Sequence, residues 1–311
     1  MIEVRRYIPA EAERWDGFVR GSRMPRFMFE RGFMDYHQDR FEDFSLMFFR
    51  DDELIAVLPA SRHGVELRSH GGLTYGGMIY GEKMKQHTML ECFDALKFFC
   101  KTSGVESILY KNIPHIYHSQ PAEEDLYALY KNGAELLKIE PATVVHLKHP
   151  YKMPKGRKAQ IARAKREGVI VQCLNDFARF IELENKVLIS RHGVRAVHTS
   201  AEIEKLHLQF PENIRCIGAF YDGNLVAGTL LFVYDKVIHT QYLAANDIAR
   251  EIGALDLIIL KIMDECRNTH EFLDFGISSE NGGRILNEGL IAQKEGFGGR
   301  TIAYQTWRSA L

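Results

Sequence analysis

The stretch YDGNLVAGTLLFVYDKVIHTQYLAAN, residues 221–246, decides the fold. It contains a charged turn, an apolar strand, a second turn and another strand. The stretch RDDELIAVLPASRHGVELRSHGGLTYGG, residues 50–77, has the same order. The two stretches indicate that one structural unit occurs twice in the chain.

The segments that follow each stretch also match in order. A helix is expected over residues 84–102 in the first half and over residues 254–267 in the second. A short strand, a further helix ending near a glycine, and a last strand come next in both halves. The second long helix carries one apolar stripe at helical spacing, made of Leu255, Ile258, Ile259, Ile262, Met263 and Cys266.

The distances between matching positions are nearly constant. The pairs Leu54 and Leu225, Glu106 and Glu271, and Gly133 and Gly296 are 171, 165 and 163 residues apart. The sequence therefore predicts an α/β (α+β) protein of two tandem domains, 1–150 and 151–311, joined near residues 150–154. Each domain is expected to hold a mixed, largely antiparallel sheet flanked by helices, because a crossover helix makes the next strand parallel to its predecessor.

Composition limits the class of protein. The chain has 311 residues, 46% of them hydrophobic, which is enough for sizeable cores and excludes a disordered protein. Forty Lys and Arg against 41 Asp and Glu leave a net charge of −1, so a protein that coats DNA or an anionic membrane is not expected.

Cysteine usage and apolar runs indicate the compartment. The five cysteines are odd in number and form no CxxC pair, which argues against a disulfide framework and against a zinc site. The first residues carry charges where an export signal needs an apolar run. The longest apolar stretch, residues 225–234, is about half of the roughly 20 residues that a membrane span requires. We therefore expect a cytoplasmic protein with no membrane span and no metal.

Three segments could carry chemistry, and each has an ordinary structural alternative. Residues 152–166 hold seven basic residues and no acid, which suits either an anion site or the solvated face of a surface helix. Arg250, Gly253 and Ala254 lie between a strand and a helix, where free N–H groups favour a phosphate; the alternative is a plain helix start. Lys294 could stabilise a developing negative charge or only the end of its helix, and Phe297 lies between glycines in the turn that follows.

Several other sites are not indicated. His146 and His149 have HxxH spacing, but they lie in or beside an expected strand, where such residues point to opposite faces. The chain has no GxSxG elbow, no Walker loop and no GxGxxG after a first strand, so the usual signals of hydrolases, NTPases and dinucleotide enzymes are missing.

The motifs together resemble the FemAB-like branch of the GNAT acyltransferase superfamily. They are the K-x-R-x-x-x-I-x-x-A-x-x-x-G pattern at 155–168, SRHG at 190–193, YLAAN-x-x-A-R-E-x-G-A at 242–254, DFG at 274–276 and KEGFGG at 294–299. The first half is similar mainly in strand order and in TYGG at 74–77, which contains Tyr75. Proteins of this branch contain two GNAT-like domains in tandem, which agrees with the internal repeat.

The resemblance implies an N-acyltransferase that moves an acyl or aminoacyl group to an amine of an anionic acceptor, such as a cell-envelope (peptidoglycan) precursor. The donor would be acyl-CoA or aminoacyl-tRNA, with tRNA then a partner. Lys294 would lie at the reacting carbonyl, and Tyr75, Lys155, Arg157 and Arg191 would hold the acceptor. Arg250, Gly253, Ala254 and Phe297 would contact the donor.

Two points stay open at this stage. Tyr242 and Asp274 are candidates for proton handling, because they close the two central strands of the second domain, although a strand tyrosine is often only a core residue. Leu255 stands where the family carries a small residue beside the donor diphosphate, which disfavours acetyl-CoA. A non-catalytic ligand-binding protein that keeps the fold is therefore the alternative function.

Overall fold

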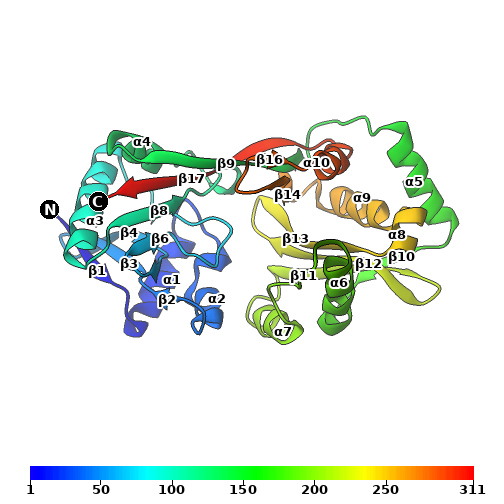
Figure 1. Ribbon diagram of the computed structural model, residues 1–311, viewed down its shortest axis with the longest axis horizontal. Helices are drawn as coiled ribbons and strands as arrows, with labels where there is room; N and C mark the ends of the chain where they lie inside the picture. Colours follow the sequence, from blue (N-terminus) through cyan, green and yellow to red (C-terminus); the bar gives the residue numbers. More distant parts are fainter. The chain divides into compact units, whose positions relative to one another are not determined.

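The computed structural model describes residues 1–311, apart from the side chain of His192 (Figure 1). The chain divides into two compact units. Unit 1 consists of residues 1–141, 279–285 and 303–311, and unit 2 of residues 142–278 and 286–302. This division differs from the predicted 1–150 and 151–311, because two long strands, β9 and β17, each supply residues to both units.

Unit 1 is built from short strands and four helices. Its elements are β1 (Ile2–Arg6), α1 (Ala12–Arg20), α2 (Arg31–Met34), β2 (Glu42–Asp43), β3 (Leu46–Arg50), β4 (Glu53–Leu58), β5 (Ser61–His63), β6 (Glu66–Arg68), β7 (Ile79–Tyr80), α3 (Gln86–Thr102), β8 (Ser107–Lys111), α4 (Glu124–Lys131), the start of β9 (Glu135–His146), β15 (Ser279–Glu280) and the end of β17 (Arg300–Ala310).

The strands of unit 1 belong to two main sheets. One has the order β1-β3-β4-β7 and is antiparallel. In the other, β8 pairs in parallel with β6 and antiparallel with β17. The parallel pairing of β8 with β6, the last strand of the stretch 50–77, is the pairing that the crossover through α3 was expected to produce. Pro59 directly follows β4 and has no N–H for a ladder, and the chain turns there into β5 and β6.

Unit 2 holds one mixed sheet with helices on both faces. Its elements are α5 (Lys155–Arg166), β10 (Ile170–Cys173), α6 (Phe177–His192), α7 (Ser200–Gln209), β11 (Ile214–Tyr221), β12 (Asn224–Val233), β13 (Val237–Ala245), α8 (Asp247–Ile252), α9 (Ala254–Cys266), β14 (Phe272–Ile277), α10 (Glu288–Glu295), the end of β9 and the start of β17; β16 (Ile285–Leu286) lies at the boundary of the units.

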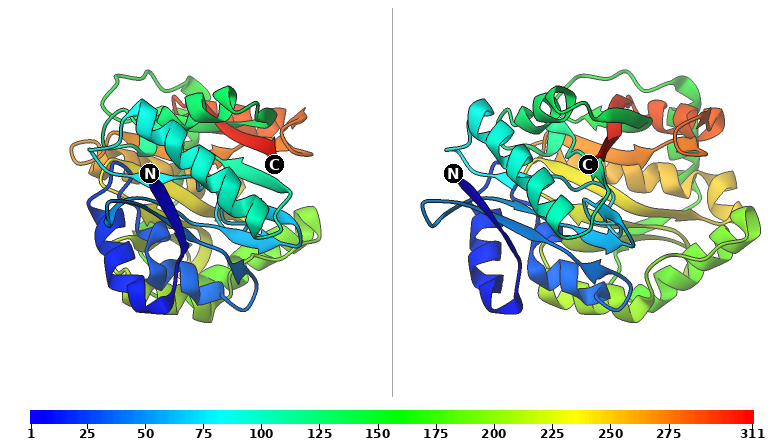
Figure 2. Two further views of the ribbon diagram at one scale, coloured as in Figure 1. Left: turned by 90° about the vertical axis from the view of Figure 1, so that its left-hand side faces the viewer. Right: turned by 60° about the vertical axis from the view of Figure 1, so that its left-hand side comes forward.

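The topology of unit 2 agrees with the predicted order. Strands β10, β11, β12 and β13 form an antiparallel meander, and the crossover through α9 makes β14 parallel to β13. Helices α9 and α6 lie on opposite faces of the meander in Figures 1 and 2. The stretch 221–246 predicted β12 and β13 of this meander, and the expected range of the crossover helix, 254–267, ends one residue beyond the observed one.

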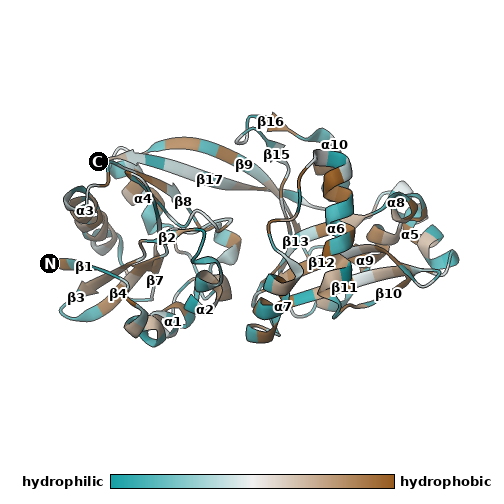
Figure 3. Ribbon diagram, turned by 60° about the horizontal axis from the view of Figure 1, so that its bottom comes forward, coloured by the Kyte–Doolittle hydropathy of each residue, from teal (hydrophilic) through white to brown (hydrophobic). Residues whose placement is uncertain are grey.

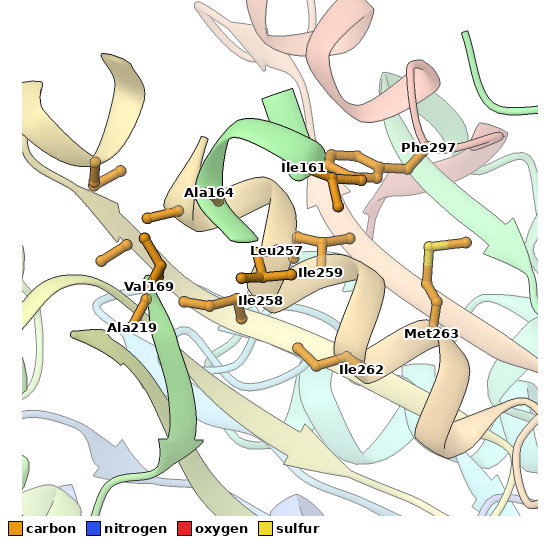
Figure 4. Packing of buried hydrophobic residues seen from close by; sticks show 14 of the residues in the cluster. Ile161, Ala164, Val169, Ala219, Leu257, Ile258, Ile259, Ile262, Met263 and Phe297 are labelled. Atoms are coloured by element: carbon orange, nitrogen blue, oxygen red, sulfur yellow. The ribbon is translucent and has the colours of Figure 1, made fainter. Parts of the chain in front are cut away.

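The core of unit 2 forms around the predicted apolar stripe of α9. Ile258, Ile259 and Ile262 are buried, and Leu255 and Cys266 pack at the edge of the cluster. Figure 4 shows Ile161 and Ala164 of α5 meeting this stripe from the other side. Full burial of one such aliphatic side chain contributes about 1.5–3 kcal/mol, so α5 and α9 hold each other in place.

Helix α6 covers the second face of the sheet. It starts at Asp176, whose side chain accepts a hydrogen bond from the backbone N–H of Arg179 at 2.9 Å, and it ends at Gly193 with φ of 66°. Phe180 lies over Gly228 of β12, where a Cβ would come within 2.8 Å of the ring. Apolar and polar residues alternate around the helix in Figure 3, so one side faces the sheet and the other faces outward.

Candidate functional site

Strands β13 and β14 separate partway along their length. They pair only at Val237 with Phe272, Ile238 with Leu273 and His239 with Asp274. Beyond that point β13 contains a bulge, since Leu230 of β12 faces Tyr242 while Leu231 faces Thr240. The second half of β13, up to Ala245, therefore has no neighbour on its β14 side, and the separation opens the sheet.

Asp274 and Lys294 fix the end of β14 after this separation. Asp274 is fully buried and accepts hydrogen bonds from the backbone N–H of Gly276 at 2.7 Å and from His239 Nδ1 at 3.1 Å. Gly276 has a φ of 70°, a left-handed conformation in which the chain turns away from β13. Asp274 thus stabilises the bend at which the two strands part.

Lys294 holds the same segment from α10. Its Nζ donates to the carbonyl oxygens of Gly276 at 3.0 Å and Ile277 at 2.7 Å, and to Ser278 Oγ at 2.9 Å. The side chain is 5% exposed, and burial lowers the pKa of its ammonium to about 8. All three ammonium protons are therefore directed at the end of β14.

A cavity of about 490 Å³ lies at the opening of the sheet. It is enclosed by α5, α6, the end of β13, α8, α9 and α10. Leu243, Ala245, Leu255, Ile259 and Phe297 give it apolar walls, and Lys294 and Glu184 add polar groups. A cavity of this size, with a few convergent polar groups on apolar walls, suits the reactive end of a small-molecule donor.

A second hollow of about 330 Å³ adjoins the cavity through Val187, Arg191 and Arg250, which line both. The nearby positive charge of Arg191 contributes, after burial, to lowering the pKa of Arg250. Arg179 and Lys186 also line the hollow. Two acids line the hollow as well: Glu182 lies 2.6 Å from Lys186, and Asp247 lies 2.8 Å from Arg250. The hollow therefore keeps a net positive charge through Arg179 and Arg191, and guanidinium groups suit phosphate oxygens.

Arg157 lines the cavity but is bound to protein groups. Its guanidinium donates to Asp256 Oδ1 at 2.6 Å and to the Gln293 carbonyl oxygen at 2.9 Å, and it lies 4.2 Å from the centre of the Phe297 ring. Lys155, two residues earlier, is exposed at the start of α5. Arg157 therefore joins α5 to α9 and α10, and Lys155 extends into solvent.

The turn at Gly253 is closely packed. Gly253 has a φ of 78°, and a Cβ there would lie 2.5 Å from the carbonyl oxygen of Gln160 in α5. Gly253 lines the cavity, whereas Ala254 is buried in the core cluster. Leu255 lines the cavity at the first turn of α9, and the Asp256 carboxylate lies in that same turn. Part of the helix start that could hold a phosphate is thus covered by α5.

Tyr242 lies on β13, next to Leu243. Its hydroxyl is 2.6 Å from His198 Nδ1, and it is not among the residues that line the described cavity. Burial raises the pKa of the Tyr242 phenol to about 12, so it keeps its proton at neutral pH. Asp274 likewise lies behind the cavity wall, where it supports Gly276.

Tyr75 belongs to unit 1, whereas the residues assembled above belong to unit 2. It is 3% exposed and its ring packs against Phe29, Tyr117 and Tyr304, with centroid distances of 6.2, 4.5 and 6.0 Å. Its observed environment is an aromatic cluster in the core of that unit.

Sequence reasoning missed one cavity residue, Glu184. It is 4% exposed and lines the cavity from α6. The signal was present, because Glu184 lies four residues after Phe180 on the apolar face of the helix, together with Phe177, Ile181 and Leu188. A carboxylate at a core-facing position calls for a functional reason.

The described residues contain neither a membrane-spanning helix nor a metal-binding cluster. No helix among them is both long and apolar enough to cross a membrane. The described side chains include no group of three or more His, Cys, Asp or Glu placed to hold a metal ion.

Comparisons with known proteins agree with this geometry. Residues 155–281 match the family described as acetyltransferase (GNAT) domain. A crystal structure of FemX has a TM-score of 0.71 at 11% identity and covers 99% of this chain and 97% of its own. No curated protein sequence matches the chain significantly.

Two further solved structures have related folds. The C-terminal domain of a putative lysylphosphatidylglycerol synthetase from Agrobacterium fabrum has a TM-score of 0.58 at 14% identity and covers 82% of this chain and 80% of its own. A tandem GNAT protein from the clavulanic acid biosynthesis pathway has a TM-score of 0.55 at 10% identity and covers 100% and 98%. The chain thus has a fold like those of FemX and of a tandem GNAT protein, and its residues 155–281 match the acetyltransferase (GNAT) domain.

Proposed function

We propose that this protein transfers an acyl or aminoacyl group from an activated, phosphate-bearing donor to the amine of an anionic acceptor. The observation that carries the proposal is the separation of β13 from β14 beyond the His239 and Asp274 pair, with a cavity of about 490 Å³ at the opening. Unpaired backbone groups of β13 are available there to a donor, and a carbonyl held among them would lie within a largely apolar wall.

The basic hollow beside the cavity supports a phosphate-bearing donor. Arg191 and Arg250 lie where the hollow meets the cavity, so they can hold phosphate groups while the acyl end extends toward Leu243. Acyl-CoA and aminoacyl-tRNA both carry phosphates behind the reactive carbonyl. Because α5 and Leu255 crowd the start of α9, we assign the phosphates to these arginines and not to the helix start.

Acyl transfer to an amine needs the donor carbonyl and the amine to be held in position, and it needs no covalent intermediate with the enzyme. Lys294 holds the end of β14, which keeps the opening of the sheet in shape, and Asp274 supports the bend. Tyr242 keeps its proton at neutral pH but does not line the described cavity, so we assign protonation of the leaving thiolate or alkoxide to solvent. Holding the carbonyl and the amine together in one cavity supplies the rest of the rate enhancement.

An anionic acceptor is proposed because exposed cations surround the site. Lys155 at the start of α5 has no ion-pair partner among the described residues, and Arg191 is exposed beside the hollow. Cell-envelope precursors are acceptors of this kind, and one protein of related fold is named as a lysylphosphatidylglycerol synthetase. We take such a precursor as the acceptor class and keep the cytoplasm as the proposed compartment.

The experiment uses matched donors and acceptors. Purified protein is given acetyl-CoA or alanyl-tRNA, together with phosphoethanolamine, glucosamine phosphate, or their uncharged counterparts ethanolamine and glucosamine, and amide formation is measured by mass spectrometry. We expect transfer from one donor class and a preference for the anionic amines. Saturable binding of a donor without transfer to any of the four amines would instead favour a non-catalytic binding protein.

Salt dependence separates the two donor classes. The affinity for a tRNA donor should fall steeply with salt, because many phosphates exchange counterions on binding. The affinity for acetyl-CoA should fall less, since fewer phosphates are neutralised.

A further inference from the structure

Glu184 is the one carboxylate in the cavity that carries no ion pair. The only other acid lining the cavity, Asp256, is 2.6 Å from Arg157. Glu184 Oε2 is buried and has no hydrogen-bond partner among the described residues. A buried carboxylate without a partner costs stability, so its presence in a well-packed helix calls for a function.

The position of Glu184 is fixed by packing on both sides along α6. Phe180, one turn earlier, is fully buried and seated over Gly228, and Leu188, one turn later, lines the same cavity. Residues four apart lie on one face of a helix, so the carboxylate is held toward the cavity by its neighbours. Rigid placement of this kind is what a group acting on a bound substrate needs.

We propose that Glu184 is the general base of the transfer, which accepts a proton from the amine of the acceptor. This inference rests on the proposed function. In the step, the C–N bond of the new amide forms, the thioester or ester bond of the donor breaks, and one proton moves from the nitrogen to Glu184 Oε2. The leaving thiolate or alkoxide takes up a proton from solvent.

The acidity of the carboxyl fits this role. Burial raises the pKa of Glu184 from 4.5 to about 7, which is the range in which a base at neutral pH works best. The neighbouring Tyr242 feels its charge, because Glu184 contributes to raising the pKa of that phenol.

Burial is the cause of the raised pKa of Glu184. Several charged and titratable groups lie on the elements around it. On the surrounding elements they are Arg157, Arg191, Arg250, Asp256 and Lys294 in the cavity wall, Tyr242 on β13, His198 before α7, and Glu202, Glu204, Lys205 and His207 on α7.

The test compares Glu184→Gln with Glu265→Gln as a matched control. Glu265 is a surface residue of α9, its carboxylate lies 3.6 Å from Lys261 Nζ, and it has no assigned role in the site. With the best donor and amine from the panel above, we expect Glu184→Gln to lose at least about a hundredfold in kcat, with KM for the donor changed less than about threefold. The control should keep the activity of the wild type.

Two readouts distinguish a base from a structural residue. The wild type should show a rise of kcat/KM through about pH 7 that Glu184→Gln lacks. With hydroxylamine as acceptor, which is largely uncharged at neutral pH, the variant should lose much less than with an alkylamine. Glu184→Asp, which keeps the carboxylate, should retain more activity than Glu184→Gln, and circular dichroism should show that all variants fold.

The outcomes separate the two proposals. Glu184→Gln with kcat within about twofold of the wild type, or an equal loss with hydroxylamine and the alkylamine, overturns the assignment of Glu184 and leaves acyl transfer standing. No transfer by the wild type from either donor overturns the proposed function and this inference with it.

Discussion

Replacing Glu184 with glutamine should stabilise the protein at high pH while it removes the proposed base. The folded-state pKa of about 7 lies above the ordinary value of 4.5, so the folded protein binds this proton more tightly than the unfolded chain does. The stabilisation that comes from the protonated carboxyl is fully present below pH 4.5 and is lost as the pH rises through about 7. Glutamine has no such dependence.

The expected size follows from the two pKa values. A difference of 2.5 between 7 and 4.5, at 1.36 kcal/mol for each pKa unit, gives about 3 kcal/mol. The variant should therefore exceed the wild type in free energy of unfolding by up to about 3 kcal/mol near pH 8.5, and by well under about 1 kcal/mol near pH 4.5. A gain of stability from loss of a functional group is a common trade-off.

The assay is urea unfolding at both pH values, followed by far-UV circular dichroism. Trp15 and Trp307 are the two tryptophans of the chain, and both lie in unit 1, so tryptophan fluorescence follows that unit separately. An equal difference between variant and wild type at both pH values, or a less stable variant near pH 8.5, would refute the reasoning. In that case the carboxylate would have a partner in solution that neutralises it.

Three further predictions concern the remaining parts of the site. Gly253→Ala should cost more than about 2 kcal/mol in the free energy of unfolding, because it combines a left-handed φ with a backbone clash; Gly156→Ala in α5, where the space is open, should be neutral or slightly stabilising. Lys294→Met should leave the circular dichroism spectrum unchanged and lower kcat at least about a hundredfold, because the segment after β14 loses three hydrogen bonds. Activity close to that of the wild type would show that transfer does not need these hydrogen bonds. Arg191→Ala and Arg250→Ala should each weaken binding of the donor by about tenfold or more and reduce its salt dependence, as measured by isothermal titration calorimetry; unchanged affinity would place the phosphates elsewhere.

The fold of unit 2 could be predicted in some detail from the sequence. Periodicity in residues 221–246 and 254–267 indicated the meander and the crossover helix, because both signals are local. The point at which β13 leaves β14 could not be predicted, since it depends on contacts of Asp274 and Lys294 with one backbone segment. The domain boundary was also out of reach, because residues 141 and 142 lie inside one continuous strand.

The candidate site was predictable only in part. The motifs indicated Lys294, Arg250 and Arg191, and all three line the same cavity. Arg157 was expected to hold a ligand, but it pairs with Asp256, which lies 99 residues away in the chain and whose role no local pattern reveals. Glu184 had a signal in its apolar helix face, but a single acid in a stripe becomes informative only when the cavity beside it is known.

The central claim is that the cavity beside the end of β13 holds the carbonyl of the donor. Leu243 lines this cavity from the part of β13 that does not pair with β14, so Leu243→Trp should fill the cavity. The new tryptophan would also report the folding of unit 2, in which the natural chain has no tryptophan. The most direct measurement is the rate of amide formation by the wild type and by Leu243→Trp, side by side with the same donor and amine. The account predicts transfer by the wild type and a loss of at least about a hundredfold in the folded variant. Equal rates in the two proteins would contradict it.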